Sequence, residues 1–124
     1  MKPEYAIIVK NKTRLEALIE RFNTKAQARF YIERLGGDFD DYEQEHDKFQ
    51  QALASLQSQL TKVIKYKIVE RRYLPSYIFS DKNIIIVIGQ DGLVANTAKY
   101  SAGLPIIAVN PVKQRYDGVL LHFD

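Results

Sequence analysis

The sequence predicts an α/β protein: a doubly wound, Rossmann-like parallel sheet forms the middle of three layers, with a long inserted helix. Residues 5–9 and 84–88 are short runs of mainly β-branched apolar residues, the composition of strands buried on both faces. Predicted helices alternate with such runs, and this order is typical of parallel sheets with right-handed crossovers. With 124 residues the chain has the length of one domain, 1–124.

Two helices are predicted after the first strand, 5–9. Thr13 and Glu16 have the spacing of a capping box, so the first helix begins after Thr13. Thr24 provides a similar start for the second helix, which Gly36 and Gly37 end. The apolar residues are Leu15, Leu18, Ile19 and Phe22 on one face of the first helix, and Phe30, Tyr31 and Leu35 in the second.

A third, longer helix begins after Asp38, which can cap it. Its stripe residues recur in alternating steps of three and four: Phe39, Tyr42, His46, Phe49, Leu53, Leu56 and Leu60. Such a stripe packs against the protein's own sheet, which is the more common case, or against a second copy, which makes a homodimer the alternative. His46 and His122 each lack a second metal-ligating residue at a suitable spacing, so we assign them no metal and expect His46 to be packed and hydrogen-bonded.

Residues 63–69 predict a strand near an edge of the sheet. Lys65 and Lys67 alternate with apolar residues, so one face of this strand is wet, and lysines on an edge strand discourage pairing with another chain. The alternative is a basic, aromatic patch for nucleic acid, which would extend to Arg71 and Arg72. No signature of a nucleic-acid-binding fold accompanies it, so we disfavour a nucleic-acid partner.

The best candidate for a central strand is 84–88, because every residue in it is apolar and β-branched. It leads into the turn Gly89-Gln90-Asp91-Gly92 and then into a helix, 93–102, that Gly103 closes. Further strands are predicted at 105–109 and 118–121.

Composition excludes several classes of function. The chain has no cysteine, which removes disulfides, thiol catalysis and cysteine-ligated metals. No segment has the length of a membrane span or of a signal-peptide core. The net charge of +3 is spread along the chain and is weak evidence for an anionic partner. We expect a cytoplasmic protein without membrane association.

The turn after 84–88 is the predicted functional centre. Ligands of open parallel sheets bind beyond the carboxyl ends of the strands, where glycine turns and helix N-termini face anions. Gly89 and Gly92 would let a phosphate approach, and Asp91 would activate a hydroxyl, bind a ribose or hold Mg²⁺. The alternative is that Asp91 only caps the next helix. Neither a dinucleotide-binding fingerprint nor a P-loop is present.

The strand and turn at 84–92, followed by a helix and by residues 104–110, resemble the NAD kinase family, in which an apolar strand ends in Gly-Gly-Asp-Gly-Thr and the next ends in Gly-Ile/Val-Asn. The resemblance implies phosphoryl transfer from ATP or polyphosphate to the ribose 2′-hydroxyl of NAD, with Mg²⁺. It also implies that Asp91 is the base or orienting group, that Gly89, Gln90 and Gly92 form the phosphate-facing turn, and that Asn110 lines the same crevice. Small-molecule nucleotides are the implied partners.

Three positions depart from the family pattern. Gln90 stands where the family has glycine, Leu93 where it has threonine, and Ala108 where it has glycine. A non-catalytic nucleotide-binding, regulatory or dimerisation module is therefore the alternative function. NAD kinases add a β-rich domain, so we expect this chain to be a piece of a longer protein and inactive by itself.

Overall fold

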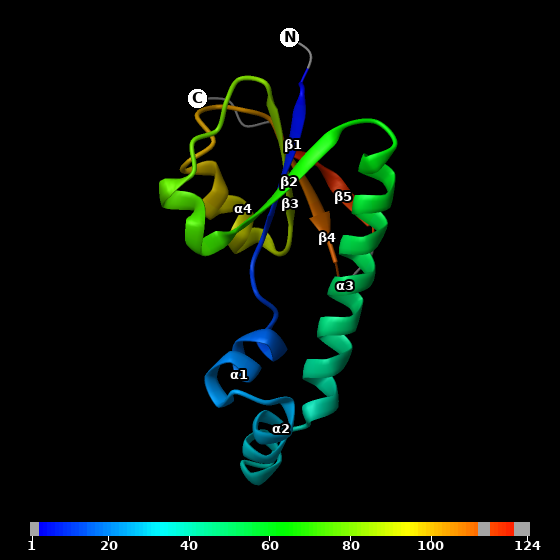
Figure 1. The fold of residues 1–124 in the computed structure, drawn as a ribbon, viewed down its shortest axis with the longest axis vertical. Helices are drawn as coiled ribbons and strands as arrows, with labels where there is room; N and C mark the ends of the chain where they lie inside the picture. Colours follow the sequence, from blue (N-terminus) through cyan, green and yellow to red (C-terminus); the bar gives the residue numbers. More distant parts are fainter. Residues whose placement is uncertain (1–2, 112–114, 121–124) are drawn as a thin grey trace.

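The computed structural model describes residues 3–111 and the backbone of residues 115–120; of Asp91 it describes only the backbone. Its centre is a five-stranded sheet in the order β2-β1-β3-β4-β5 (Figure 1). The strands are β1 (Tyr5–Lys10), β2 (Lys65–Glu70), β3 (Asn83–Ile88), β4 (Ile106–Asn110) and β5 (Arg115–Leu120). β1 to β4 are parallel, which confirms the predicted sheet with β3 at its centre and β2 at an edge.

β5 runs antiparallel to β4. The 118–121 strand was predicted without a direction, and Leu121 and His122 lie outside the described residues. A parallel neighbour needs a crossover of a dozen or more residues, whereas only four residues separate β4 from β5. The short connection therefore requires the antiparallel arrangement.

The first three helices begin at the predicted caps. The helices are α1 (Arg14–Phe22), α2 (Lys25–Arg34), α3 (Phe39–Thr61) and α4 (Asp91–Ala98), with a 3₁₀ helix, η1 (Arg71–Ser76). Thr13 and Glu16 form the reciprocal capping box, Thr24 accepts a hydrogen bond from the Gln27 N–H, and Asp38 accepts one from the Asp40 N–H. These side chains satisfy N–H groups that have no acceptor within the helix.

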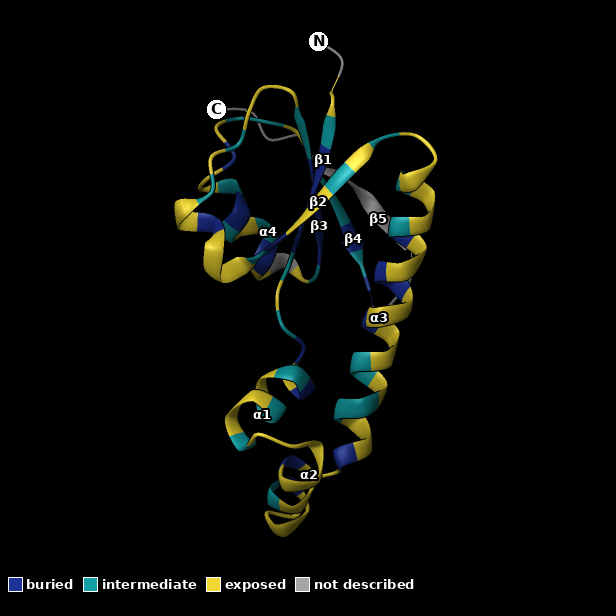
Figure 2. Ribbon diagram, in the orientation of Figure 1, coloured by how far each residue is buried: buried dark blue, intermediate teal, exposed yellow. Residues whose placement is uncertain are grey.

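Helices cover both faces of the sheet and make three layers. On one face α3 packs over the even-numbered residues of β1 and β3, such as Ile8 and Ile86. On the other, α4 and η1 pack over odd-numbered residues such as Ile7 and Ile85. β1 and β3 are consequently buried on both sides, whereas the edge strand β2 and the outward-facing parts of the helices are largely exposed (Figure 2).

The stripe along α3 is used inside the chain. Phe49, Leu53 and Leu56 pack on the sheet, and Phe39 packs with α1 and α2. All four side chains are buried. The first interpretation of the stripe, packing within its own chain, is therefore confirmed.

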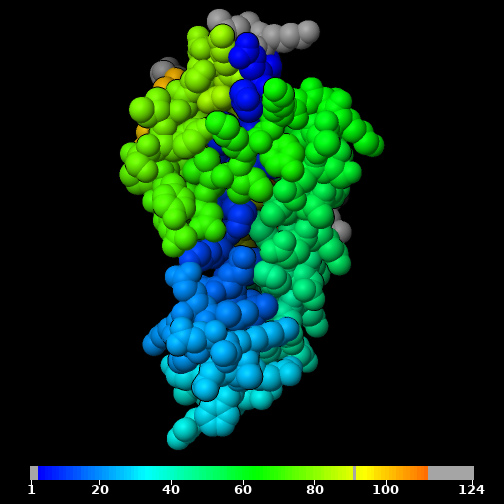
Figure 3. Space-filling view, in the orientation of Figure 1, coloured from blue at the N-terminus to red at the C-terminus, as the bar shows by residue number. Residues whose placement is uncertain are grey.

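The first half of α3, together with α1 and α2, extends beyond the carboxyl ends of the strands, and Figure 3 shows this helical end below the sheet. Ala28 and Ile32 are the buried residues of α2. Phe30 and Leu35, two of the apolar residues noted in its sequence, are 63% and 68% exposed. Ala28 and Ile32 lie four residues apart on the face of α2 that packs against α1 and α3. The larger side chains of Phe30 and Leu35 lie off this face and point to solvent.

The structure differs from the predicted elements in two details. Val63 precedes β2 and is exposed, and Ile68 is exposed although Ile64 and Tyr66 pack against the cluster under α3. The helix predicted at 93–102 begins two residues earlier and ends at Ala98; Ala102 and Gly103 follow in left-handed conformation. Within the described part of the chain, no helix is both long and apolar enough to cross a membrane.

Candidate functional site

A crevice of about 770 Å³ lies between the carboxyl ends of the strands and the helical extension. It is formed by the loop after β1, one face of α3, and the segments that follow β2, β3 and β4. The lining residues are Asn11, Lys12, Thr13, Arg14, Asp41, Gln44, Glu45, Lys48, Phe49, Arg71, Ile88, Gly89, Gln90, Gly92, Leu93 and Pro111.

The position of the crevice follows from the strand order. From β1 the chain continues to β2 on one side of it, and then returns to β3 on the other side. The loops that leave β1 and β3 therefore diverge at their carboxyl ends, which is the switch point where open α/β sheets bind ligands. Gly89, Gln90 and Gly92 lie at this point, as the sequence predicted.

Gly89 joins β3 to α4 through a closely packed turn. Its N–H donates a hydrogen bond to the carbonyl of Val109 on β4, at 3.1 Å. A Cβ added at Gly89 would lie 2.9 Å from Cδ2 of Leu93, whose side chain is buried. Glycine at this position therefore lets the first turn of α4 pack directly against the end of β3.

Gly92 has a different environment, in the first turn of α4. A Cβ added there would meet no atom within 4 Å. Gly92 lines the crevice and has no side chain of its own, so a ligand can approach its backbone closely.

The N-terminus of α4 keeps donors available. Gln90 occupies the N-cap position, and its side chain makes no capping hydrogen bond. The first N–H groups of a helix have no acceptor inside it and carry partial positive charge. Asp91 is the first residue of α4, so Gln90, which has an extended backbone, holds the N-cap position one residue earlier than the sequence suggested.

The N-terminus of α1 also borders the crevice, but its own residues satisfy it. The Glu16 N–H donates to Oγ1 of Thr13 at 3.2 Å, and the Thr13 N–H donates to Oε1 of Glu16 at 2.9 Å. At the start of α4 the N-cap residue, Gln90, makes no such bond, which makes this helix end the better position for an anionic group.

Two basic side chains of the crevice have carboxylate partners. Lys12 pairs with Glu20. Nε of Arg14 donates to both carboxylate oxygens of Glu45 at 3.1 Å, and this hydrogen bonding raises the pKa of Arg14 further above its ordinary value. Lys48 and Arg71 are exposed and form no ion pair with any residue that the structure describes.

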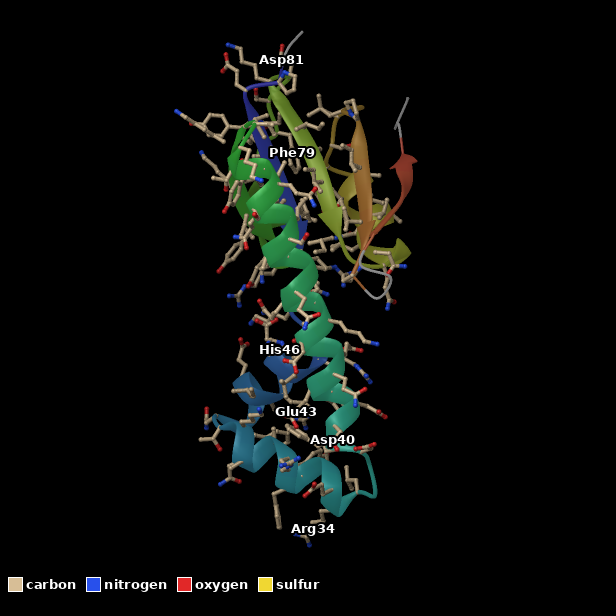
Figure 4. The ribbon with its side chains drawn as sticks, turned by 90° about the vertical axis from the view of Figure 1, so that its right-hand side faces the viewer. Arg34, Asp40, Glu43, His46, Phe79 and Asp81 are labelled. Atoms are coloured by element: carbon tan, nitrogen blue, oxygen red, sulfur yellow. The ribbon has the colours of Figure 1, made fainter. Side chains whose placement is uncertain are left out.

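His46 lies just outside the crevice, where it connects α3 to the loop after β1. Its Nδ1 is 2.8 Å from Oγ1 of Thr13. In Figure 4 it is labelled at the level of α1, nearer the sheet than Glu43 and Asp40. This confirms the prediction of a packed, hydrogen-bonded histidine. Among the described residues, no cluster of three or more His, Cys, Asp or Glu side chains could hold a metal.

The structure thus places three of the five predicted site residues on the crevice. Asn110 ends β4 next to the lining residue Pro111 but is not itself among the lining residues described, and the side chain of Asp91 lies outside the description. Sequence reasoning did not assign Lys12, Arg14 or Lys48 to the site. Lys12 and Arg14 lie in the segment just after a predicted strand, so the sequence could have placed them at the ligand-binding edge of the sheet. No neighbouring residue in the sequence indicates such a position for Lys48.

Comparison with known protein families finds no matching family model, and comparison with curated proteins finds no significant match.

Proposed function

We propose that this chain forms the nucleotide-binding part of an NAD kinase-like phosphotransferase. One observation carries the proposal: the Gly89–Gly92 turn and the N-terminus of α4, whose N-cap Gln90 makes no capping hydrogen bond, open together into a crevice at the switch point of the sheet. Backbone donors at an open helix end and a glycine without a side chain are what a phosphate group requires.

In this proposal the phosphoryl group passes from ATP or polyphosphate to the 2′-hydroxyl of NAD. Asp91, the first residue of α4, would orient the acceptor hydroxyl or take its proton. Mg²⁺ bound to a nucleotide needs only one or two protein carboxylates, so the reaction requires no dedicated cage of metal ligands. The ion would neutralise charge on the phosphates.

A second candidate function is nucleotide binding without transfer. Leu93, at the position of the family's threonine, is buried in the core with Ile85 and Val87 and offers no hydroxyl to a ligand. This side chain supports packing of the turn and contributes nothing to binding a phosphate. A chain that had lost the chemistry but kept the crevice would show this pattern.

Binding measurements by calorimetry on the chain test the proposal, with ATP, NAD, NADP and polyphosphate, each with and without Mg²⁺. We expect binding of ATP or NAD that weakens in Gly92→Ala, because the new methyl group enters the space into which the phosphate would come. If none of the four compounds binds, the proposal is wrong. Binding of nucleotide without formation of NADP, in any form of the protein, would favour the second candidate.

A further inference from the structure

Lys48 and Arg71 differ from the other basic residues of the crevice. Lys12 and Arg14 already contact Glu20 and Glu45. An anion that reached either of them would have to compete with a carboxylate. Lys48 and Arg71 line the same crevice and have no such competitor in the described part of the chain. They can therefore receive an anionic ligand without the loss of an ion pair to any side chain that the structure describes.

Both residues lie at the sheet end of the crevice. Arg71 directly follows Glu70, the last residue of β2, at the carboxyl edge of the sheet. Lys48 precedes Phe49, whose ring packs in the same core cluster as Ile88, the last residue of β3. The two cations thus belong to the same level of the molecule as the Gly89–Gly92 turn.

The other end of the crevice has the opposite character. Asp41 precedes Lys48 by seven residues on the crevice-lining face of α3, which separates them by roughly 10 Å along the helix axis. Gln44 and the paired Glu45 lie between them. A bound molecule would therefore meet two cations near the sheet and, at the helical end, Asp41 and the charge-balanced Arg14–Glu45 pair, which orients a ligand that is anionic at one end only.

We propose that Lys48 and Arg71 act as a two-cation clamp on the terminal phosphates of a nucleotide whose phosphate chain also reaches the N-terminus of α4. The inference rests on the proposed function and deepens it, because it selects ligands with two or more phosphates over monophosphates. Hydrogen bonds to charged phosphate oxygens are the strong ones, and arginine can donate two in parallel. Neither residue belongs to the motif that carries the resemblance to NAD kinases.

The clamp is tested by calorimetric titration of the chain with ATP, AMP and inorganic tripolyphosphate. We expect Lys48→Gln and Arg71→Gln each to weaken ATP binding by about 10-fold or more, since a lost charge-assisted hydrogen bond corresponds to at least that factor. AMP binding should change little in either variant. Lys48→Arg keeps the charge and should keep the affinity for ATP.

Arg72→Gln and Lys65→Gln are the matched controls. Each removes one positive charge at an exposed position outside the crevice lining. We expect them to leave ATP affinity within about twofold, as for surface charges that act only through screened long-range fields. An effect as large as that of Lys48→Gln would mean that net charge alone drives binding, and would overturn the clamp.

The remaining outcomes separate the clamp from the proposed function. If Gly92→Ala weakens ATP binding while Lys48→Gln and Arg71→Gln do not, the clamp is wrong and nucleotide binding stands. If tripolyphosphate binds as well as ATP, depends on Lys48 and Arg71, and is indifferent to Gly92→Ala, the two cations bind a phosphate chain without the α4 turn, and the nucleotide site proposed at that turn is wrong. Absence of binding for all three probes overturns both.

Discussion

Oγ1 of Thr13 lies 2.8 Å from Nδ1 of His46, so a hydrogen bond connects the loop after β1 to the middle of α3 across 33 positions of sequence. The same hydroxyl caps α1 by accepting from the Glu16 N–H. Thr13 is buried and lines the crevice. One side chain therefore holds the wall of the crevice, the start of α1 and the long helix in a common arrangement.

Thr13→Ala should destabilise the protein by more than the loss of a helix cap. An N-cap substitution costs about 0.5–2 kcal/mol. Here the half-buried His46 also loses its hydrogen-bond partner, which adds about 1 kcal/mol or more. Thr24→Ala is the control, because Thr24 caps α2 from an exposed position. Equal free energies of unfolding for the two variants in urea would contradict the role of the Thr13–His46 contact.

Gly89→Ala and Gly92→Ala should have opposite effects on stability. The methyl group at Gly89 forces the buried Leu93 to move and should lower the free energy of unfolding by about 1–3 kcal/mol, the usual cost of overpacking. At Gly92 the methyl group meets open space in a helical turn, so alanine should stabilise by about 0.4–1 kcal/mol. Thermal unfolding measures both, and a lower Tm for Gly92→Ala would refute the open-space geometry.

Asp91→Asn tests the catalytic role in any form of the protein that transfers phosphate. If Asp91 activates or orients the acceptor hydroxyl, turnover should fall by about 10²–10⁴-fold, the usual contribution of general-base catalysis. The melting temperature should change little, because Asp91 lies at the first position of α4, where a carboxylate contributes only about 0.3–1 kcal/mol. Turnover within a few fold of the parent would remove Asp91 from the mechanism.

Glu43 should contribute to stability against acid. Nζ of Lys25 lies 2.6 Å from its carboxylate, and this hydrogen bond lowers the pKa of Glu43 below its ordinary value of 4.5. A carboxyl whose pKa is lower in the folded state stabilises the fold above its unfolded pKa and loses that contribution as the pH falls through the folded value. The Glu43 side chain lies in the N-terminal part of α3, beside α1 and α2 (Figure 4).

We therefore expect Glu43→Gln to flatten the decline of Tm below about pH 4.5, and high salt to reduce the difference. Lys25→Gln should have the same effect on the acid side, because it removes the partner. Carboxyl groups titrate within the range from about pH 2 to 7. If the Tm curves of Glu43→Gln and the parent superimpose over this range, Glu43 makes no such contribution.

The sequence by itself determined the elements that depend on neighbouring residues. The run at 84–88 predicted β3 because its apolar, β-branched composition suits a strand buried on both faces. Thr13, Thr24 and Asp38 predicted the starts of three helices because caps satisfy N–H groups only two or three residues away. The turn at Gly89 and Gly92 was placed correctly at the carboxyl edge of the sheet, since its position follows directly from the strand before it.

Only the tertiary structure decided what depends on distant parts of the chain. The exposure of Phe30, the contact between Thr13 and His46, and the division of the crevice cations into paired and unpaired ones all depend on how α1, α2 and α3 meet. Lys48 gives the clearest case. From the sequence, a lysine on a helix is expected to be a solvated surface residue, and only the tertiary structure shows that Lys48 lines a crevice. Helix caps and apolar periodicity act within a few residues of the chain, whereas a crevice is made by elements that are far apart in sequence and brought together by packing.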